Sequence, residues 1–168
     1  VLNRPSRLPL SDAFPEWEEL SGLPDLVFEG GPVDRDALIA LGRSQACDGT
    51  MALGAHSIDL DSQPALAVAE GIVQVRVFAG YAGWASGQLE GEIANHGWWV
   101  VDGSIDDLFT DDPVRLWSRV LQRQGGDLAW GARARAIVSG PTSPEGGKSH
   151  PPASSCLPNT RGAPALSP

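Results

Sequence analysis

The stretch Ile72–Trp84, with the sequence IVQVRVFAGYAGW, decides how the rest of the chain must be arranged. Its first half places Val73, Val75 and Val77 at alternate positions, with polar residues between them. This alternation is typical of a β-strand with one face on an apolar core and the other face in solvent. The two glycines of Gly80–Trp84 then predict a turn directly after the strand.

Helical and extended segments alternate irregularly on both sides of this strand. Asp112 and Pro113 predict the start of a helix, because aspartate caps helix N-termini and proline suits the first turn. Ser86 is predicted to cap another helix, which Gly97 ends. The predicted helices span 11–20, 62–70, 86–97 and 113–124, and the further predicted strands span 26–28, 37–41 and 98–101. Because no regular strand–helix–strand repeat links these segments, the sequence predicts the α+β class.

Composition and charge narrow the class of protein. The 168 residues are enough for one ordinary domain, and with 42% apolar and 20% charged residues the chain has a globular composition. No apolar run approaches the roughly 20 residues that a membrane-spanning helix needs. The 21 acidic and 12 basic residues give a formal charge of −9, which argues against nucleic acids and anionic membranes as partners.

The composition changes sharply near residue 131. The last 38 residues, 131–168, contain 7 Pro, 5 Gly and 6 Ser but only 1 acidic and 4 basic residues. Because few large apolar side chains remain there, burial cannot offset the entropy lost on ordering the segment. The sequence therefore predicts one domain over residues 1–130 and a disordered tail over residues 131–168.

Familiar catalytic and ligand-binding motifs fail in this chain. Gly147–Ser149 resembles the end of a phosphate-binding loop, but Thr142 occupies the position of the first glycine. His56 is predicted on the opposite strand face from Asp59 and Asp61, which does not suit a shared metal ion. We therefore assign no catalytic, cofactor-binding or metal-ligating residue from the sequence.

One group of polar and aromatic side chains is a candidate binding site. Gln88 and Glu92 are four residues apart and so share one face of the predicted helix. Tyr81 and Trp84 lie just before that helix, which predicts an aromatic cleft with polar groups in it. The alternative interpretation is that the two aromatic residues pack in the core or at its rim.

Several strings resemble motifs of the bacterial YqgE/AlgH family: VLNRP at 1–5, FEGGPV at 28–33, and FAGYAGW at 78–84 followed by QLE at 88–90. The resemblance extends over about residues 1–128. It implies a single α+β domain with a branched, mixed β-sheet folded into a pseudo-barrel and flanking helices. The family it points to has no established enzymatic activity or cofactor, and part of it carries a transcriptional-regulator label.

The chain departs from this family pattern at both ends. Family members have early strands before the LNRP string, whereas this chain begins inside it, and the sequence after Trp130 is atypical. We therefore expect an N-terminally truncated form with an unrelated tail. Loss of an early strand would uncover a sheet edge and an apolar face, which predicts self-association.

Three functional hypotheses follow. The first is a non-enzymatic, cytoplasmic interaction or regulatory protein that meets a protein or small-molecule partner through preformed glycine-bearing loops. The second is a small-molecule-binding protein or enzyme with a cleft over residues 81–92. The third is a transcriptional regulator, favoured only by the arginines at every fourth position of the predicted helix 113–124 (Arg115, Arg119, Arg123). The candidate partner or ligand site comprises Asn3, Arg4, Glu29, Gly30, Gly31, Tyr81, Trp84, Gln88 and Glu92.

Overall fold

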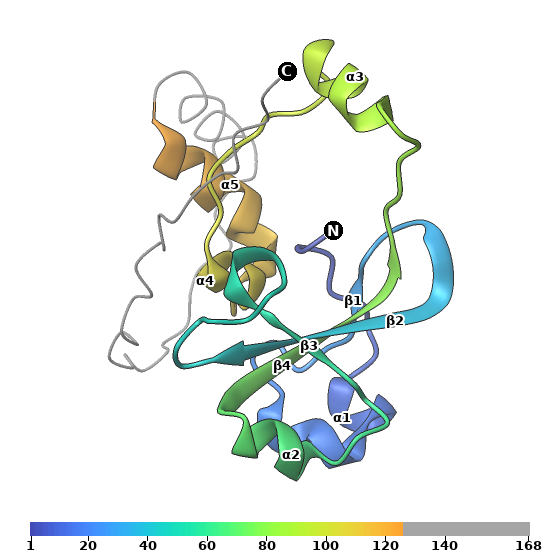
Figure 1. Cartoon of the computed structure of the whole chain (residues 1–168), viewed down its shortest axis with the longest axis vertical. Helices are drawn as coiled ribbons and strands as arrows, with labels where there is room; N and C mark the ends of the chain where they lie inside the picture. The colour runs from blue at the N-terminus through green and yellow to red at the C-terminus, as the bar shows by residue number, and fades with distance from the viewer. Residues whose placement is uncertain (126–168) are drawn as a thin grey trace, which may run out of the picture.

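The computed structural model describes residues 1–125, which form a mixed four-stranded sheet with helices on both faces (Figure 1). The strands are β1 (Phe28–Glu29), β2 (Val33–Ser44), β3 (His56–Ile58) and β4 (Ile72–Tyr81). The helices are α1 (Leu10–Ala13), α2 (Pro64–Ala69), α3 (Gln88–Ala94), α4 (Ile105–Leu108) and α5 (Pro113–Gln124), with short 3₁₀ helices at Pro15–Leu20 and Ala52–Gly54. The predicted α+β class is confirmed.

The sheet is built around β4, in the strand order β1-β4-β2-β3. β1 runs parallel to β4, while β2 is antiparallel to both β4 and β3. Within the described residues, β3 pairs with residues 40–42 of β2 alone. Before that point the register of β2 against β4 shifts between Val33 and Leu38, so this end of β2 bulges away from its neighbour.

The predicted strand is confirmed as β4, but its two faces differ from the prediction. Val75 and Val77 are buried as expected, while Val73 at the start of the strand is 46% exposed. The alternation also predicts Arg76 on a solvent face, and this prediction is wrong, because Arg76 is only 2% exposed. Since Phe78 on the same face is buried too, β4 has an apolar layer on each side.

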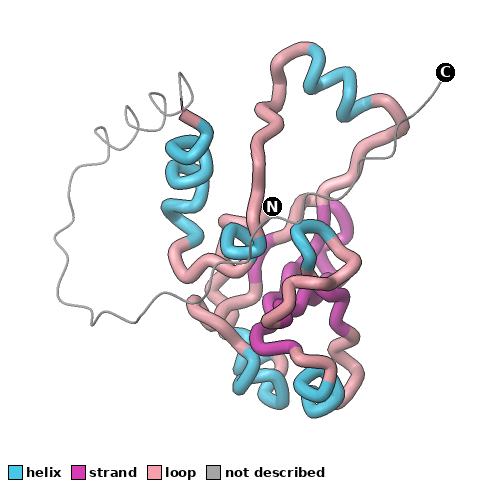
Figure 2. Tube along the Cα trace, turned by 60° about the vertical axis from the view of Figure 1, so that its left-hand side comes forward, coloured by secondary structure: helices cyan, strands magenta, loops and turns pink. Residues whose placement is uncertain are grey.

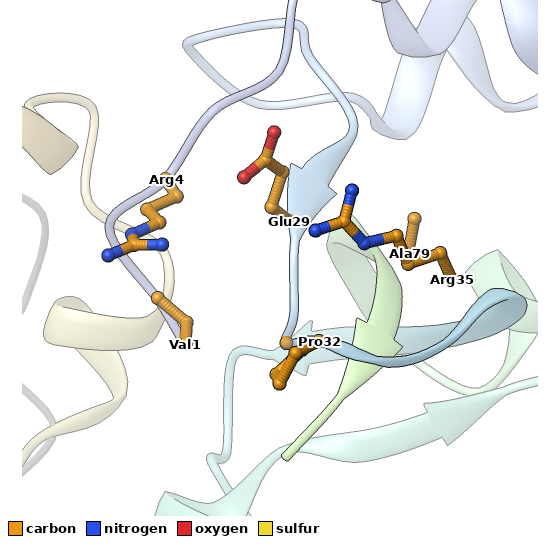
Figure 3. Close-up of a pocket in the computed structure, with 7 residues that line it drawn as sticks. Val1, Arg4, Glu29, Pro32, Arg35 and Ala79 are labelled. Atoms are coloured by element: carbon orange, nitrogen blue, oxygen red, sulfur yellow. The ribbon is translucent and has the colours of Figure 1, made fainter.

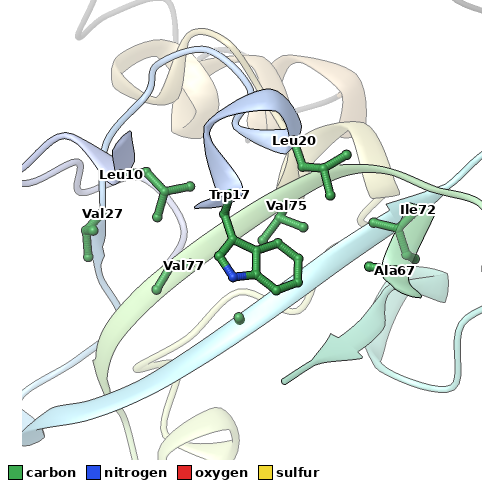
Figure 4. Packing of buried hydrophobic residues seen from close by; sticks show 9 residues of the cluster. Leu10, Trp17, Leu20, Val27, Ala67, Ile72, Val75 and Val77 are labelled. Carbon is green, nitrogen blue, oxygen red and sulfur yellow. The ribbon is translucent and has the colours of Figure 1, made fainter. Parts of the chain in front are cut away.

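The first apolar layer covers the side of the sheet that faces α1 and α2 (Figure 4). Trp17 lies at its centre with no exposed surface, and its indole N–H donates to the carbonyl of Leu60 over 3.3 Å. The other buried members are Leu10, Leu20, Val27, Ala40, Ala67, Ile72, Val75 and Val77. Because the single donor of the indole is satisfied, burying Trp17 stabilises the fold and leaves no polar group unpaired.

The second apolar layer lies on the opposite side of the sheet, against α4. Phe28 of β1 and Phe78 of β4 have ring centroids 5.7 Å apart, and Leu108 and Phe109 pack in the same cluster. α4 begins at Ser104 with a capping box, in which the Ser104 and Asp107 side chains each accept from the other's backbone N–H. This cap sets the start of the segment that seals the second layer.

Arg76 fits between these apolar groups because backbone carbonyls take its donors. The guanidinium donates to the carbonyls of Leu108 (2.9 Å), Leu23 (2.9 Å) and Thr110 (2.8 Å). It also lies 4.4 Å from the centroid of the Phe28 ring. One side chain of β4 thus holds the turn after α4 and the loop before β1 against the sheet.

Some predicted helix details are confirmed and others are wrong. Asp112 caps α5 by accepting from the backbone N–H of Arg115, as predicted. The helix predicted over 11–20 instead divides at Pro15 into α1 and the 3₁₀ helix. Proline disfavours helical backbone in the residue before it, and Phe14 accordingly has an extended φ of −139°. Ser86 does not cap α3, which begins after Gly87.

No strand forms at residues 98–101, so that prediction is wrong. The structure gives these residues an irregular path on the way to α4, with Trp98, Trp99 and Val100 exposed. The tail predicted over 131–168, and the last five residues of the predicted domain, lie outside the described residues. Within residues 1–125, no helix has the length and apolar character to cross a membrane.

Candidate functional site

Residues 82–104 form an arm that leaves the end of β4, carries α3 at its tip and returns to α4 (Figure 1). The same excursion stands away from the sheet in the second view (Figure 2). None of its residues is buried, and α3 itself buries no residue. The arm therefore adds nothing to either apolar layer, which separates its role from that of the core.

The foot of the arm is held by close backbone contacts between glycines. The N–H of Gly30 donates to the carbonyl of Ala79 over 2.8 Å. A Cβ at Gly30 would overlap the carbonyl oxygen of Gly80, and one at Gly31 would overlap the carbonyl of Tyr81. Gly80 also has a φ of +71°, in the region that side chains disfavour. These positions fix where the arm starts.

Four side chains of the arm form one hydrogen-bonded group, here named the indole cluster: Trp84, Gln88, Glu92 and Trp98. One carboxylate oxygen of Glu92 accepts from the indole N–H groups of Trp84 (3.2 Å) and Trp98 (2.6 Å). The other oxygen accepts from the Gln88 amide over 2.9 Å. The Gln88 carbonyl in turn accepts from the Ala85 backbone N–H, which ties the cluster to the turn before α3.

The helix end of α3 brings Trp98 back to the cluster. His96 has a φ of +60°, and its N–H donates to the carbonyl of Ile93, while the N–H of Gly97 donates to the carbonyl of Glu92. This pair of bonds is the Schellman helix end, which reverses the chain direction. The sequence indicated that Gly97 ends the helix, but it did not indicate that the reversal would place Trp98 on Glu92.

The electrostatics of the cluster centre on Glu92. The hydrogen bonds from Trp98, Gln88 and Trp84 hold the pKa of the Glu92 carboxyl below its ordinary value. The carboxylate is therefore charged at neutral pH, and its three side-chain donors are all neutral. The two indoles lie 5.8 Å apart with their planes at 76°, and they remain 39% (Trp84) and 50% (Trp98) exposed.

The other part of the predicted site lies beneath the arm, around a cavity of about 150 Å³ (Figure 3). Arg4 from the N-terminal segment, Glu29 from β1 and Arg35 from β2 line it together with Gly31. Arg35 was not among the residues predicted from the sequence. Arg35 lies in the irregular part of β2, between the paired residues Val33 and Leu38, so no strand periodicity indicates that it lines this cavity.

The structure thus divides the nine predicted site residues between two places. Trp84, Gln88 and Glu92 come together in the indole cluster, and Arg4, Glu29 and Gly31 come together around the cavity. The remaining three belong to neither group: Asn3 is half-buried, Gly30 bonds to β4, and Tyr81 is 40% exposed at the foot of the arm. The two cavities described, at the arm's foot and beside Leu38, include no residue of the indole cluster.

Two of the three arginines on α5 hydrogen-bond within the chain, and the third, Arg115, is 80% exposed. Arg123 donates to both carboxylate oxygens of Asp107 (3.0 and 2.6 Å), and Arg119 donates to the Thr110 hydroxyl. Arg115 lies 3.7 Å from the Asp112 carboxylate. Among residues 1–125, no three or more His, Cys, Asp or Glu side chains form a group that could hold a metal ion.

Comparison with known proteins identifies relatives along most of the chain. A family model described as AlgH-like matches residues 1–129. A UPF0301 protein of Thermobifida fusca is 45% identical over 145 residues, covering 77% of this chain and 72% of the relative. The UPF0301 protein SCO2948 of Streptomyces coelicolor is 40% identical over 138 residues, covering 77% and 71%.

Two solved structures share the fold. The crystal structure of DIP2367 from Corynebacterium diphtheriae superposes with a TM-score of 0.70 at 26% identity, covering 78% of this chain and 72% of that one. The solution structure of AlgH from Pseudomonas aeruginosa, also 26% identical, gives a TM-score of 0.51 and covers 86% and 77%. The family model over residues 1–129 and the 45% identical relative show the family to which the motifs pointed: the chain belongs to the AlgH-like family.

Proposed function

We propose that this protein is a non-enzymatic interaction protein of the cytoplasm, and that its partner contacts the indole cluster of the arm. The observation that carries the proposal is a set of exposed side chains already fixed by hydrogen bonds. Trp84, Gln88 and Trp98 are all held on one carboxylate, yet none is buried. Ordering side chains on binding costs free energy, and a surface that is ordered beforehand avoids much of that cost.

The residue types favour a protein partner. Tryptophan dominates the energetics of many protein interfaces, since it buries a large area with few rotatable bonds. A regulatory role would follow from this contact. Direct DNA binding is the weaker alternative, because two of the three arginines of α5, Arg119 and Arg123, hydrogen-bond to Thr110 and Asp107.

The proposal can be tested by placing a photo-crosslinking amino acid at one of two positions in turn and identifying the proteins that become attached. Ala85 lies next to Trp84 in the arm, whereas Leu66 is 59% exposed on α2, at the opposite end of the molecule (Figure 1). We expect a discrete protein adduct from position 85 that is lost in the Trp84→Ala, Gln88→Ala double variant, and no such adduct from position 66. Equal adducts from both positions, or turnover of a metabolite abolished by the double variant, would contradict the proposal.

The cavity beneath the arm supports a second candidate function, the binding of a small anionic molecule. Its two guanidinium groups, from Arg4 and Arg35, are suited to carboxylates or phosphates, although Glu29 opposes an anion there. Thermal unfolding with and without inorganic phosphate measures this binding. A stabilisation by phosphate that Arg35→Gln removes would support the second candidate, and no effect of phosphate would oppose it.

A further inference from the structure

We propose that the indole cluster is a receptor for a cationic side chain, arginine or lysine, presented by the protein partner. This inference rests on the proposed function and specifies the chemistry of the contact. It predicts that the partner carries a basic residue in an exposed segment, and that this residue lies over the faces of Trp84 and Trp98 beside the charge of Glu92.

The first step of the argument is an uncompensated negative charge. The arginine–carboxylate ion pairs within residues 1–125 join Arg43 to Asp106, Arg115 to Asp112 and Arg123 to Asp107. Glu92 instead receives neutral donors, which orient its carboxylate without neutralising it. An oriented carboxylate near the surface therefore keeps its attraction for a cation from outside.

The second step is the direction of the indoles. Both indole N–H groups point at the same oxygen of Glu92, so the positive edges of the rings face the carboxylate. The two rings pack edge to face, with centroids 5.8 Å apart and planes at 76°, so each ring covers part of the other. Trp84 and Trp98 nevertheless remain 39% and 50% exposed, and this exposed aromatic surface lies beside the Glu92 carboxylate. Exposed tryptophan rings attract ammonium and guanidinium groups through cation–π interactions, which tryptophan provides best among the aromatic residues.

The third step is charge complementarity over the whole arm. Its 23 residues, 82–104, contain the carboxylates Glu90, Glu92 and Asp102 and no Lys or Arg. The full chain carries a formal charge of −9. This field attracts basic segments and repels nucleic acids and anionic lipid surfaces. A neutral apolar peptide would bury the indoles but would leave the Glu92 charge without a partner, which costs free energy at a desolvated contact.

The experiment uses short peptides as probes and the indole N–H signals of the full chain in NMR spectra as the readout. The probes are acetyl-Gly-Arg-Gly-amide, its lysine analogue, and an analogue with citrulline, which has the shape of arginine without its charge. We expect saturable shifts of the Trp84 and Trp98 signals with arginine and lysine, and binding at least about tenfold weaker with citrulline. Raising the salt concentration should weaken the two cationic peptides only.

Variants of the protein localise the effect. Trp98→Leu and Glu92→Gln should lose the shifts, whereas Trp99→Leu should keep them, since Trp99 is 60% exposed in the same arm but pairs with Trp117. If Glu92→Gln rearranges the cluster, the comparison of the three peptides on the wild-type protein still tests the inference. Equal binding of citrulline and arginine, or shifts confined to Trp99 and Trp117, would overturn the inference.

The two proposals fail in different ways. If the adduct from position 85 forms but its yield is unchanged by high salt and by Glu92→Gln, the cationic receptor is wrong and the interaction surface stands. If no adduct forms from position 85, the interaction surface itself is wrong, whatever the short peptides do.

Discussion

At the scale of single residues, Arg76 is the side chain on which the stability of the fold depends most. Burial lowers its pKa to about 10, while the charge of Asp111 acts in the opposite direction, so the guanidinium stays protonated at neutral pH. Its donors are used by the carbonyls of Leu108, Leu23 and Thr110. A buried cation of this kind is tolerated because its donors are satisfied, and removing it would leave three carbonyls without these partners.

Replacing Arg76 should therefore destabilise the fold strongly. We expect Arg76→Met to cost about 2–4 kcal/mol of unfolding free energy, because it removes the donors to those carbonyls. Arg76→Lys keeps the charge but not the planar fork, and should fall between Met and the wild type. Chemical denaturation measures both variants. If Arg76→Met were as stable as the wild type, the hydrogen bonds of Arg76 to the three carbonyls would not contribute to stability.

Asp107 gives the protein a sensitivity to acid. Its burial opposes ionisation, but hydrogen bonds from Arg123 and from the Ser104 backbone outweigh burial and hold its pKa below the ordinary 3.8. A carboxyl with a lowered pKa stabilises the fold fully above its unfolded pKa, and this contribution is lost as the pH falls through the folded pKa. The loss should therefore begin below about pH 4.

The matched variants are Asp107→Asn and, as a control on an exposed carboxyl, Asp12→Asn. At pH 7 we expect Asp107→Asn to lower the unfolding free energy by about 1–2 kcal/mol, and near pH 3 we expect this deficit to shrink. Asp12→Asn should change little at either pH. Urea titrations at the two pH values measure the effect. A deficit that stays constant with pH would argue against the ion pair as its cause.

At the scale of elements, the foot of the arm and its helix respond differently to the same substitution. Gly31→Ala should destabilise the protein by about 1–3 kcal/mol, because the new methyl group would overlap the Tyr81 carbonyl. Gly91→Ala in α3 meets nothing within 4 Å and should stabilise the helix by about 0.5–1 kcal/mol. Thermal unfolding compares the two. Unchanged thermal stability of Gly31→Ala would contradict the prediction, because it would show that the backbone at the foot of the arm can move to make room for the methyl group.

The sequence predicted helices and strands well where a single local signal determines the element. The valine alternation located β4, and Asp112 with Pro113 located the start of α5. The predictions failed where the local structure depends on a contact between residues that are distant in the sequence or on the path of the chain around them. The stretch 98–101 has strand composition, but the turn at His96 and Gly97 takes Trp98 to Glu92, and none of the strands within residues 1–125 pairs with it.

The candidate site was partly predictable for the same reason. The spacing of Gln88 and Glu92 on one helix face is local, and the structure joins them by a hydrogen bond. The position of the fourth member, Trp98, depended on a chain reversal, and the position of Arg35 depended on the irregular part of β2 between Val33 and Leu38. The burial of Arg76 followed from the second apolar layer, which no periodicity in β4 alone could indicate.

At the scale of the whole molecule, the described residues leave part of the sheet accessible. β3 ends its pairing at Ala40 of β2, so within the described strands the preceding residues of β2 have β4 alone as a neighbour. Leu38 and Ile39 are 46% and 39% exposed there, beside a cavity of about 260 Å³. An exposed strand edge with apolar side chains favours pairing with another chain.

We therefore predict concentration-dependent self-association through this end of β2. Sedimentation velocity should show association at high protein concentration, and Leu38→Lys should reduce it by placing a charge on the edge. Leu66→Lys on α2, which is also exposed, should leave the association unchanged. A single monomeric species at every concentration would contradict the prediction.

Because no residue from 82 to 103 is buried, substitutions there leave both apolar layers intact. Packing limits which substitutions the two apolar layers accept, whereas in the arm the proposed partner contact would set the limit. Under the proposed function, new binding specificities could be engineered by changing the arm while the sheet and both apolar layers keep their sequence.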